Sequence, residues 1–269
     1  MKLYQITIPQ LSAPERADKL LPRLLPELPV WQLREAFAKR DVRCKDVRIA
    51  KETLLQTGDA VRIYTKHAPL SIDCIYQDDA YVIVNKMQGM EVQGIGSVES
   101  VLARQLGFEV FACHRLDVQT GGLLLLAKNK QALEKAQKAF ADRLVGRVYH
   151  AMVCGTPLPA EASCRAFLQK DAAAATVRIS AHQRPGALPI QTKYRVLEPG
   201  EISRVEAELC TGRTHQIRAH FAYLGHPVLG DDKYGNRAIN HQYGVRKQML
   251  WCVRLTLWDG RSFCTDAPF

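Results

Sequence analysis

The sequence lacks the paired cysteines, long apolar segments and glycine-rich loops that mark several large classes of protein. Its eight cysteines include no Cys-x-x-Cys pair, so a zinc ribbon or a thioredoxin-like motif is unsupported. The apolar run Leu123–Ala127 is far too short to cross a membrane, and the N-terminus has no apolar core of a signal peptide. Gly94-Ile95-Gly96 is too short for a nucleotide-binding loop. We expect a cytoplasmic protein without a membrane anchor or a nucleotide cofactor.

A surplus of positive charge is the main feature of the composition. The net charge is +10 over 269 residues, while the charged share of 24% is usual for a globular chain. Residues 1–66 hold 13 Lys and Arg against 8 Asp and Glu, so half of the excess lies in about a quarter of the chain. A basic surface favours polyanionic partners, nucleic acid first and an anionic membrane second. Many soluble proteins have a similar charge without binding RNA, so charge alone leaves this open.

Two regions differ in pattern, and we expect one domain in each. Residues 1–66 combine an alternating segment at 3–8, a short helix at 31–38 and a closing strand at 60–64. This pattern predicts a small, basic α/β domain. His67-Ala68-Pro69 is interpreted as the linker that follows it.

The second region, residues 67–269, mixes strands with a few helices. Strands are expected at 81–85, 123–128, 147–153, 191–197, 202–209 and 248–257, and helices at 97–106, 129–144 and 214–224. Ser97 and Thr214 are suitable N-caps, and Gly107 and Gly225 suit the positions after the helix ends. Since no regular βαβ repeat occurs, the predicted class is α+β, with a mixed, largely antiparallel sheet and flanking helices.

A polar segment at residues 113–129, CHRLDVQTGGLLLLAKN, runs directly into a predicted buried strand. Its polar side chains are those of His114, Arg115, Asp117 and Thr120. They should lie at the mouth of the strand, where binding sites are often built. A turn in which Asp117 and Thr120 bond their own backbone explains the spacing equally well. The pattern leaves both interpretations open.

A second segment, residues 211–235, concentrates basic and titratable side chains. They are Arg213, His215, Arg218, His220 and His226. A surface helix facing water would have the same composition. The five-residue spacing of His215 and His220 is a poor fit to a helical metal site, so no metal is predicted. A cluster that binds phosphate suits the basic character better.

These two segments resemble the signatures of one enzyme family, the RluA family of pseudouridine synthases. HRLDVQTGGLLLLAKN is similar to its HRLDxxTSGLLLLAK signature, and GRTHQIRAHFAYLGHPVLGDDKYG resembles the second signature nearly residue for residue. DDAYVIVNKMQGMEV is similar to the family's opening strand and NKPxG turn. The resemblance covers roughly residues 70–269. Residues 13–65 resemble the small αL RNA-binding domain that precedes many members.

The resemblance implies three catalytic residues. Asp117 matches the family's catalytic aspartate, and Arg218 matches an arginine that pairs with it. Burial of a carboxylate favours its neutral form, whereas a nearby arginine favours the charged form that the reaction needs. Tyr149, in GRVYHAMV, matches a tyrosine that stacks on the target uracil. Without the resemblance, Tyr149 would be interpreted as a core strand tyrosine.

The same resemblance implies a set of substrate-binding residues. Arg115 matches a residue that enters the RNA when the nucleotide flips out, and Leu250 matches an apolar residue beside the uridine. The expected substrate-binding residues are His114, Arg115, Thr120, Arg213, His215 and Leu250.

The chain departs from the family pattern at four places. Gly121 replaces a serine, Met87 replaces the proline of NKPxG, and Leu250-Trp251-Cys252 replaces Leu-His-Ala. Residues 43–46, Arg-Cys-Lys-Asp, stand where a Val-Asn-Gly turn is expected. None of these changes affects Asp117, Tyr149 or Arg218.

The resemblance therefore implies an isomerase that converts uridine to pseudouridine in structured RNA without a cofactor. Large-subunit ribosomal RNA is the expected substrate, with transfer RNA as the alternative. We expect a monomer that binds RNA and no membrane. A non-catalytic RNA-binding or assembly factor on the same fold is the competing hypothesis, and the altered turn at residues 43–46 is its only support.

Overall fold

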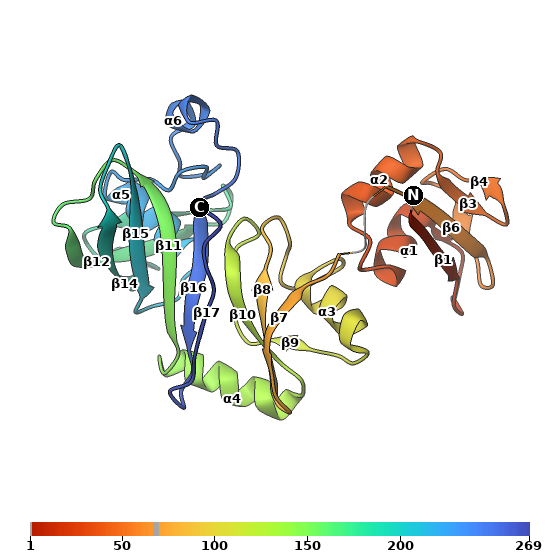
Figure 1. The fold of residues 1–269 in the computed structure, drawn as a ribbon, viewed down its shortest axis with the longest axis horizontal. Coiled ribbons are helices and arrows are strands. Elements are labelled where there is room, and N and C mark those ends of the chain that lie inside the picture. The colour runs from red at the N-terminus through yellow and green to blue at the C-terminus, as the bar shows by residue number, and fades with distance from the viewer. Residues whose placement is uncertain (1, 67–69) are drawn as a thin grey trace. The chain divides into compact units, whose positions relative to one another are not determined.

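The chain forms two compact units (Figure 1). The computed structural model describes residues 2–66 and 70–269. One unit comprises Met1–Ile72 with Glu91–Val110, and the other comprises Asp73–Met90 with Phe111–Phe269. The predicted linker His67-Ala68-Pro69 lies outside the described residues, so that boundary stays a prediction. In the described ranges, no helix is long and apolar enough to span a bilayer.

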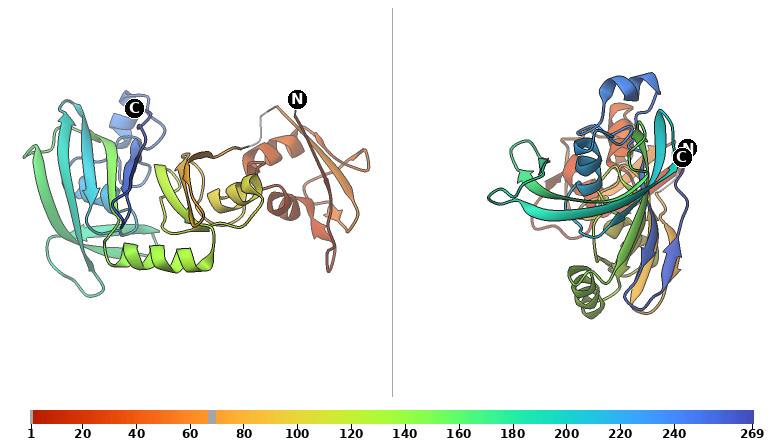
Figure 2. Two further views of the ribbon diagram at one scale, coloured as in Figure 1. Left: turned by 60° about the horizontal axis from the view of Figure 1, so that its bottom comes forward. Right: turned by 90° about the vertical axis from the view of Figure 1, so that its left-hand side faces the viewer.

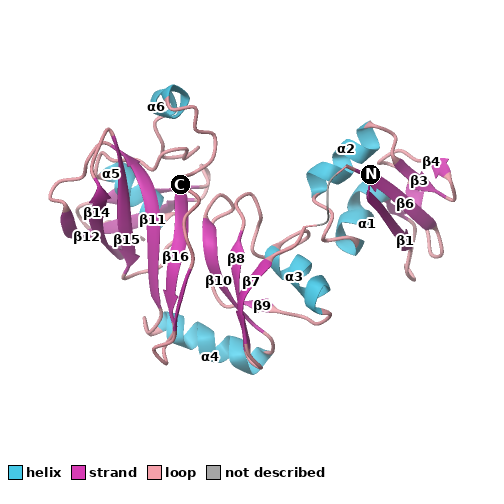
Figure 3. Cartoon of the chain, in the orientation of Figure 1, coloured by secondary structure: helices cyan, strands magenta, loops and turns pink. Residues whose placement is uncertain are grey.

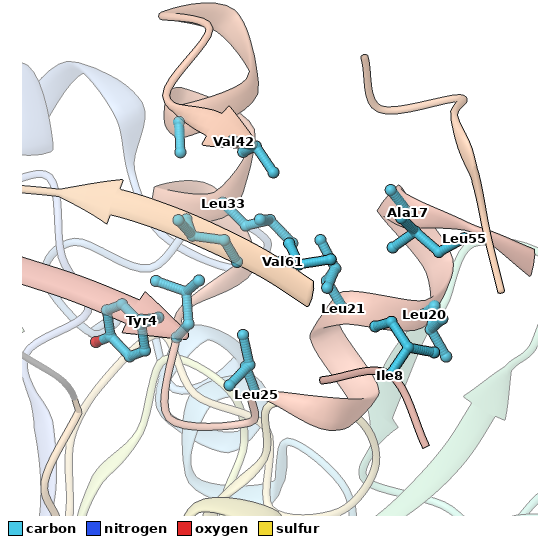
Figure 4. Close-up of a cluster of buried hydrophobic side chains, with 13 residues drawn as sticks. Tyr4, Ile8, Ala17, Leu20, Leu21, Leu25, Leu33, Val42, Leu55 and Val61 are labelled. Carbon is cyan, nitrogen blue, oxygen red and sulfur yellow. The ribbon is translucent and has the colours of Figure 1, made fainter. Parts of the chain in front are cut away.

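The first unit has a buried core that two of its helices share with a small sheet. Its strands are β1 Lys2–Thr7, β2 Glu15–Arg16, β3 Val42–Cys44, β4 Val47–Arg48, β5 Leu54–Leu55 and β6 Ala60–Thr65, and its helices are α1 Ala17–Leu24, α2 Val30–Ala38 and α3 Val98–Leu106. The sheet order is β1-β6-β3-β4, and β2 pairs with β5. Leu21 of α1, Leu33 of α2 and Val61 of β6 meet in a buried apolar core (Figure 4). Ser97 accepts a hydrogen bond from the Ser100 N–H and caps α3, as predicted.

The altered turn at residues 43–46 still closes a hairpin. Cys44 pairs with Val47, and Lys45 and Asp46 both have positive φ, of 48° and 65°. Two successive left-handed residues are the geometry of the two-residue turn that Asn-Gly usually supplies. Ion pairs from Lys45 to Asp59 at 2.9 Å and from Asp46 to Arg62 at 2.6 Å accompany this backbone. The departure from the family pattern therefore leaves the hairpin formed.

The second unit is built on one long, twisted sheet (Figures 2 and 3). The strand order is β13-β12-β14-β15-β11-β16-β10-β8-β7, with β17 on β16 and β9 on β10. The strands are β7 Asp73–Gln77, β8 Tyr81–Lys86, β9 Phe111–Ala112, β10 Gly121–Ala127, β11 Gly146–Cys154, β12 Glu161–Asp171, β13 Thr176–Ser180, β14 Leu188–Glu198, β15 Ile202–Leu209, β16 Leu250–Thr256 and β17 Ser262–Cys264. The helices are α4 Lys130–Ala141, α5 Gln216–Tyr223 and α6 Arg237–Gln242. Only β10 and β16 pair in parallel among the described strands, which confirms the predicted α+β class.

Two helix boundaries differ from the prediction, each for a local reason. Helix α4 ends at Ala141 instead of Leu144, because Arg143 turns left-handed (φ 60°) and the Leu144 N–H bonds back to the Ala139 carbonyl. The predicted Thr214 cap is wrong. Helix α5 begins after His215, which is itself left-handed (φ 54°).

Two departures from the family pattern touch each other at the β10–β16 junction. Gly121 lies opposite Trp251, and a Cβ at position 121 would fall 2.1 Å from the indole ring. The next residue, Gly122, has φ +109°, and its Cβ would meet the Cys252 backbone at 2.3 Å. The large ring of Trp251 therefore fits only because residue 121 has no side chain.

Gly121→Ser should lower the free energy of unfolding by about 1–3 kcal/mol through overpacking. Trp251→His should also destabilise the chain, because it replaces the buried indole by a smaller ring. We expect the double variant to lose less free energy of unfolding than the two single variants together, since the smaller ring makes room for the serine. Urea unfolding of the four proteins measures this coupling. Additive losses would contradict the proposed contact.

Candidate active site

A cavity of about 680 Å³ lies in the second unit, between the segment before β10, the start of β11 and the segment entering α5. This volume is in the usual range for a binding pocket. All nine residues predicted for the site line it: His114, Arg115, Asp117, Thr120, Tyr149, Arg213, His215, Arg218 and Leu250. The structure thus brings together residues that are far apart in the sequence.

Arg218, on α5, is the best-connected side chain of the cavity. Its side chain is 4% exposed, and it donates to both oxygens of Asp231, through Nε at 2.6 Å and Nη2 at 2.9 Å. Nη1 donates to Asp117 Oδ2 and Nη2 to Asp232 Oδ1, each at 3.1 Å. Burial alone would lower the pKa of Arg218, but the hydrogen bonds and charges of Asp231 and Asp117 raise it above its ordinary value.

Asp231 is a site residue that the sequence interpretation missed. It is 1% exposed, and its Oδ1 also accepts the Lys233 and Tyr234 backbone N–H groups at 2.8 and 2.9 Å. Burial would raise the pKa of Asp231, but the Arg218 guanidinium keeps that pKa below its usual value. The Gly-Asp-Asp of the second signature was the available signal. Because Asp231 uses both oxygens on Arg218, it orients that arginine and is not a free second acid.

Asp117 sits on a short turn whose backbone is tightly held. The Thr120 N–H donates to the Asp117 carbonyl at 3.0 Å, so a turn forms through the backbone. The side chains of Asp117 and Thr120 do not cap it, because they bond Arg218 and Gln248. The buried ammonium of Lys86 donates to the Val118 carbonyl at 3.1 Å, and the Gln88 side chain donates to the Gln119 carbonyl at 2.8 Å. Burial lowers the pKa of Lys86 to about 8, although the charge of Asp117 opposes that shift. The carboxylate itself is 17% exposed to the cavity.

Tyr149 lies on β11 beside an irregularity in the sheet. The pairing of β11 with β16 shifts register between Val148 and Tyr149, so that Tyr149 faces Cys252 and Val253 is the extra residue. Bulges of this kind often re-aim a side chain next to a site. Tyr149 is 4% exposed, and burial raises the pKa of its hydroxyl well above the ordinary value. Its ring and the Leu250 side chain supply an apolar part of the cavity lining.

His215 lies close to Asp117 without a direct hydrogen bond. Its Nε2 is 3.9 Å from Asp117 Oδ2, and its Nδ1 is 2.9 Å from the Tyr234 hydroxyl. The same hydroxyl accepts the Val177 N–H at 2.8 Å. Burial lowers the pKa of His215, which favours its neutral form.

The remaining predicted residues divide into exposed and structural ones. Arg115 and Arg213 are exposed at the cavity. The His114 Nε2 accepts the Leu125 N–H at 3.1 Å, and its ring packs 4.7 Å from that of Phe140. The Thr120 hydroxyl accepts from the side chain of Gln248 at 2.8 Å. His114 and Thr120 therefore hold the framework of the cavity as well as lining it.

The five basic and titratable residues of the second segment do not form one cluster. His220 is buried and bonds Thr192 at 3.0 Å, whereas His226 bonds the Cys154 carbonyl at 2.9 Å. Across residues 2–66 and 70–269, no group of three His, Cys, Asp or Glu side chains could hold a metal ion.

Comparison with known proteins decides the family. A family described as RNA pseudouridylate synthase matches residues 80–223. The chain is 33% identical to the ribosomal large subunit pseudouridine synthase C of Vibrio cholerae, over 93% of this chain and 87% of that protein. The chain belongs to the RNA pseudouridylate synthase family. The resemblance inferred from the two signatures is confirmed.

Further comparisons agree with this assignment. The synthase is 31% identical to the ribosomal large subunit pseudouridine synthase C of Escherichia coli, over 90% of this chain and 82% of that one. Its fold is similar to that of the human RNA pseudouridylate synthase domain containing 1, with a TM-score of 0.66 and 28% identity. That match covers 76% of this chain and 87% of the human chain.

In this synthase, Asp231→Asn should lower the free energy of unfolding by about 3–5 kcal/mol, because it leaves a buried guanidinium without its main partner. Asp232 bonds the same arginine but its side chain is 69% exposed, so Asp232→Asn should cost less than about 1 kcal/mol. Urea unfolding of both variants measures the contrast. Equal losses would show that Asp231 is not the dominant partner of Arg218.

Acid should destabilise the synthase through its buried His220. Burial lowers the pKa of His220 from 6.5 to about 4. Below pH 6.5 this histidine therefore takes up a proton in the unfolded chain but stays neutral in the folded chain. The free energy of unfolding then falls by about 1.4 kcal/mol per pH unit for that histidine, until about pH 4. His220→Gln should remove this part of the slope between pH 6 and 4. The exposed His182, changed to Gln, is the control, and an unaltered slope in His220→Gln would refute the assignment.

Proposed function

We propose that this synthase isomerises uridines of large-subunit ribosomal RNA and that Asp117 is its catalytic carboxylate. The observation that carries the proposal is the pairing of Asp117 Oδ2 with the buried Arg218 Nη1 at 3.1 Å, in a cavity that Tyr149 also lines. The names of the relatives in Vibrio cholerae and Escherichia coli supply the RNA class.

The reaction exchanges one bond of the nucleoside for another. The C1′–N1 bond breaks, the uracil turns, C1′ bonds to C5, and the proton that leaves C5 is balanced by one gained at N1. Asp117 is the group that attacks the sugar or the base, or that removes a sugar proton. Arg218 pairs with this carboxylate and cannot serve as an acid, since a guanidinium does not give up its proton.

The uridine must leave its stack to reach Asp117. Unstacking costs a few kcal/mol. Stacking on an aromatic side chain offsets part of this cost, since it stabilises each base by roughly 1–3 kcal/mol. In this proposal the ring of Tyr149 supplies that surface and Leu250 packs beside the base. Arg115, which is exposed at the cavity, takes the space that the base leaves in the RNA.

Residues 1–66, the basic part of the first unit, are the part of the chain that we assign to binding the surrounding RNA. Its hairpin is formed despite the altered turn, which removes the one argument for a non-catalytic factor. Transfer RNA remains the alternative substrate. A monomer acting in the cytoplasm is part of the proposal.

Asp117→Asn should reduce pseudouridine formation at least about a thousandfold, because it removes the reacting group. RNA binding should stay within a few fold of the wild type. The measurement is pseudouridine content of unmodified large-subunit ribosomal RNA after incubation with each purified protein. Asp171→Asn, an ion-paired carboxylate on β12 outside the cavity, is the matched control. Wild-type levels of pseudouridine from Asp117→Asn would contradict the assignment of Asp117 as the catalytic carboxylate.

A further inference from the structure

Arg147 is a cavity residue to which neither the sequence motifs nor the proposed mechanism gives a role. It lies on β11 two residues before Tyr149, so both side chains point to the same face of the sheet. Both line the cavity. The charge of Arg147 acts on several groups there: it contributes to lowering the pKa of His114 and opposes the rise in the pKa of Tyr149.

The guanidinium of Arg147 lies close to two neighbours. Its Cζ is 5.5 Å from the centre of the Phe140 ring. The second neighbour is Gly212, where a Cβ would fall 2.7 Å from Nη1 and 2.8 Å from Nη2. Gly212 does not have the positive φ that favours glycine. The absence of a side chain at Gly212 therefore allows the guanidinium to approach closely.

Arg147 has no anionic partner in the described part of the chain. Its Nε is buried without a hydrogen-bond partner, and no carboxylate there forms a salt bridge with it. Arg218, in the same cavity, is bonded to three carboxylates. A positioned arginine whose charge is not neutralised by the protein is suited to an anion that arrives with the ligand.

We infer that Arg147 binds a phosphate of the RNA backbone next to the flipped uridine, an inference that rests on the proposed function. A uridine in RNA enters the cavity with a phosphodiester on each side of its ribose. Two strand residues span about 7 Å, which is comparable to the reach from a base ring to its own phosphate. With the base on Tyr149, a backbone phosphate can therefore reach the fork of Arg147, whose donors match phosphate oxygens in pairs.

Salt dependence of RNA binding tests this site independently of turnover. The probe is a short, fluorescently labelled oligouridylate, titrated with the full chain at several salt concentrations. Arg147→Met should weaken binding about tenfold or more, and it should reduce the slope of log affinity against log salt by about 0.7, the value for one phosphate contact on a single strand. Arg147→Lys should keep most of the slope. Arg165→Met removes the same charge from an exposed position on β12 outside the cavity and should leave the slope unchanged.

A slope for Arg147→Met equal to that of the wild type would overturn the inference, because a residue that only packs would not move it. Gly212→Ala provides a second test that retains the charge. It should weaken oligouridylate binding in the wild type, by displacing the guanidinium, and have no further effect in Arg147→Met. An equal loss in both backgrounds would also overturn the inference. Both results concern binding alone, so they are distinct from a failure of the wild type to form pseudouridine, which would refute the proposed function.

Discussion

The buried ion network around Arg218 is the interaction on which the rest of the site depends. A guanidinium that is 4% exposed needs partners, because burying a charge without them costs several kcal/mol. Asp231 supplies two hydrogen bonds and Asp117 a third. These contacts tie helix α5, the segment after it and the turn before β10 into one arrangement. The position of Asp117 is thus a consequence of satisfying Arg218.

Two arginines that line the cavity, Arg218 and Arg147, differ in their partners. Arg218 is surrounded by carboxylates, so its charge is used within the protein and it orients Asp117. Arg147 lies close to Phe140 and Gly212, but no carboxylate in the described part of the chain forms an ion pair with it. In the proposed function this division suits a polyanionic substrate, since Arg218 pairs with the proposed catalytic carboxylate and Arg147 is available to the RNA backbone.

Much of the fold and nine residues of the cavity lining could be predicted from the sequence, because the information is local. The buried run of β10, the Ser97 cap and the two signature segments are each visible in short stretches of residues. The last turn of α4 and the start of α5 could not be predicted, since Arg143 and His215 are left-handed, which is uncommon for residues other than glycine. The contacts of Asp231 with Arg218 and of Arg147 with Phe140 and Gly212 depend on packing between distant segments. The contact of Gly121 with Trp251 shows the same limit: two apparent departures from a family pattern are one compensated change.

Mapping of pseudouridine in total RNA, from cells with and without this protein, tests the central claim most directly. The account predicts that one or more uridines of large-subunit ribosomal RNA lose their modification in the deletion strain and regain it when the wild-type chain is restored. Unchanged modification of every ribosomal position would contradict the account, and loss confined to transfer RNA would replace its substrate.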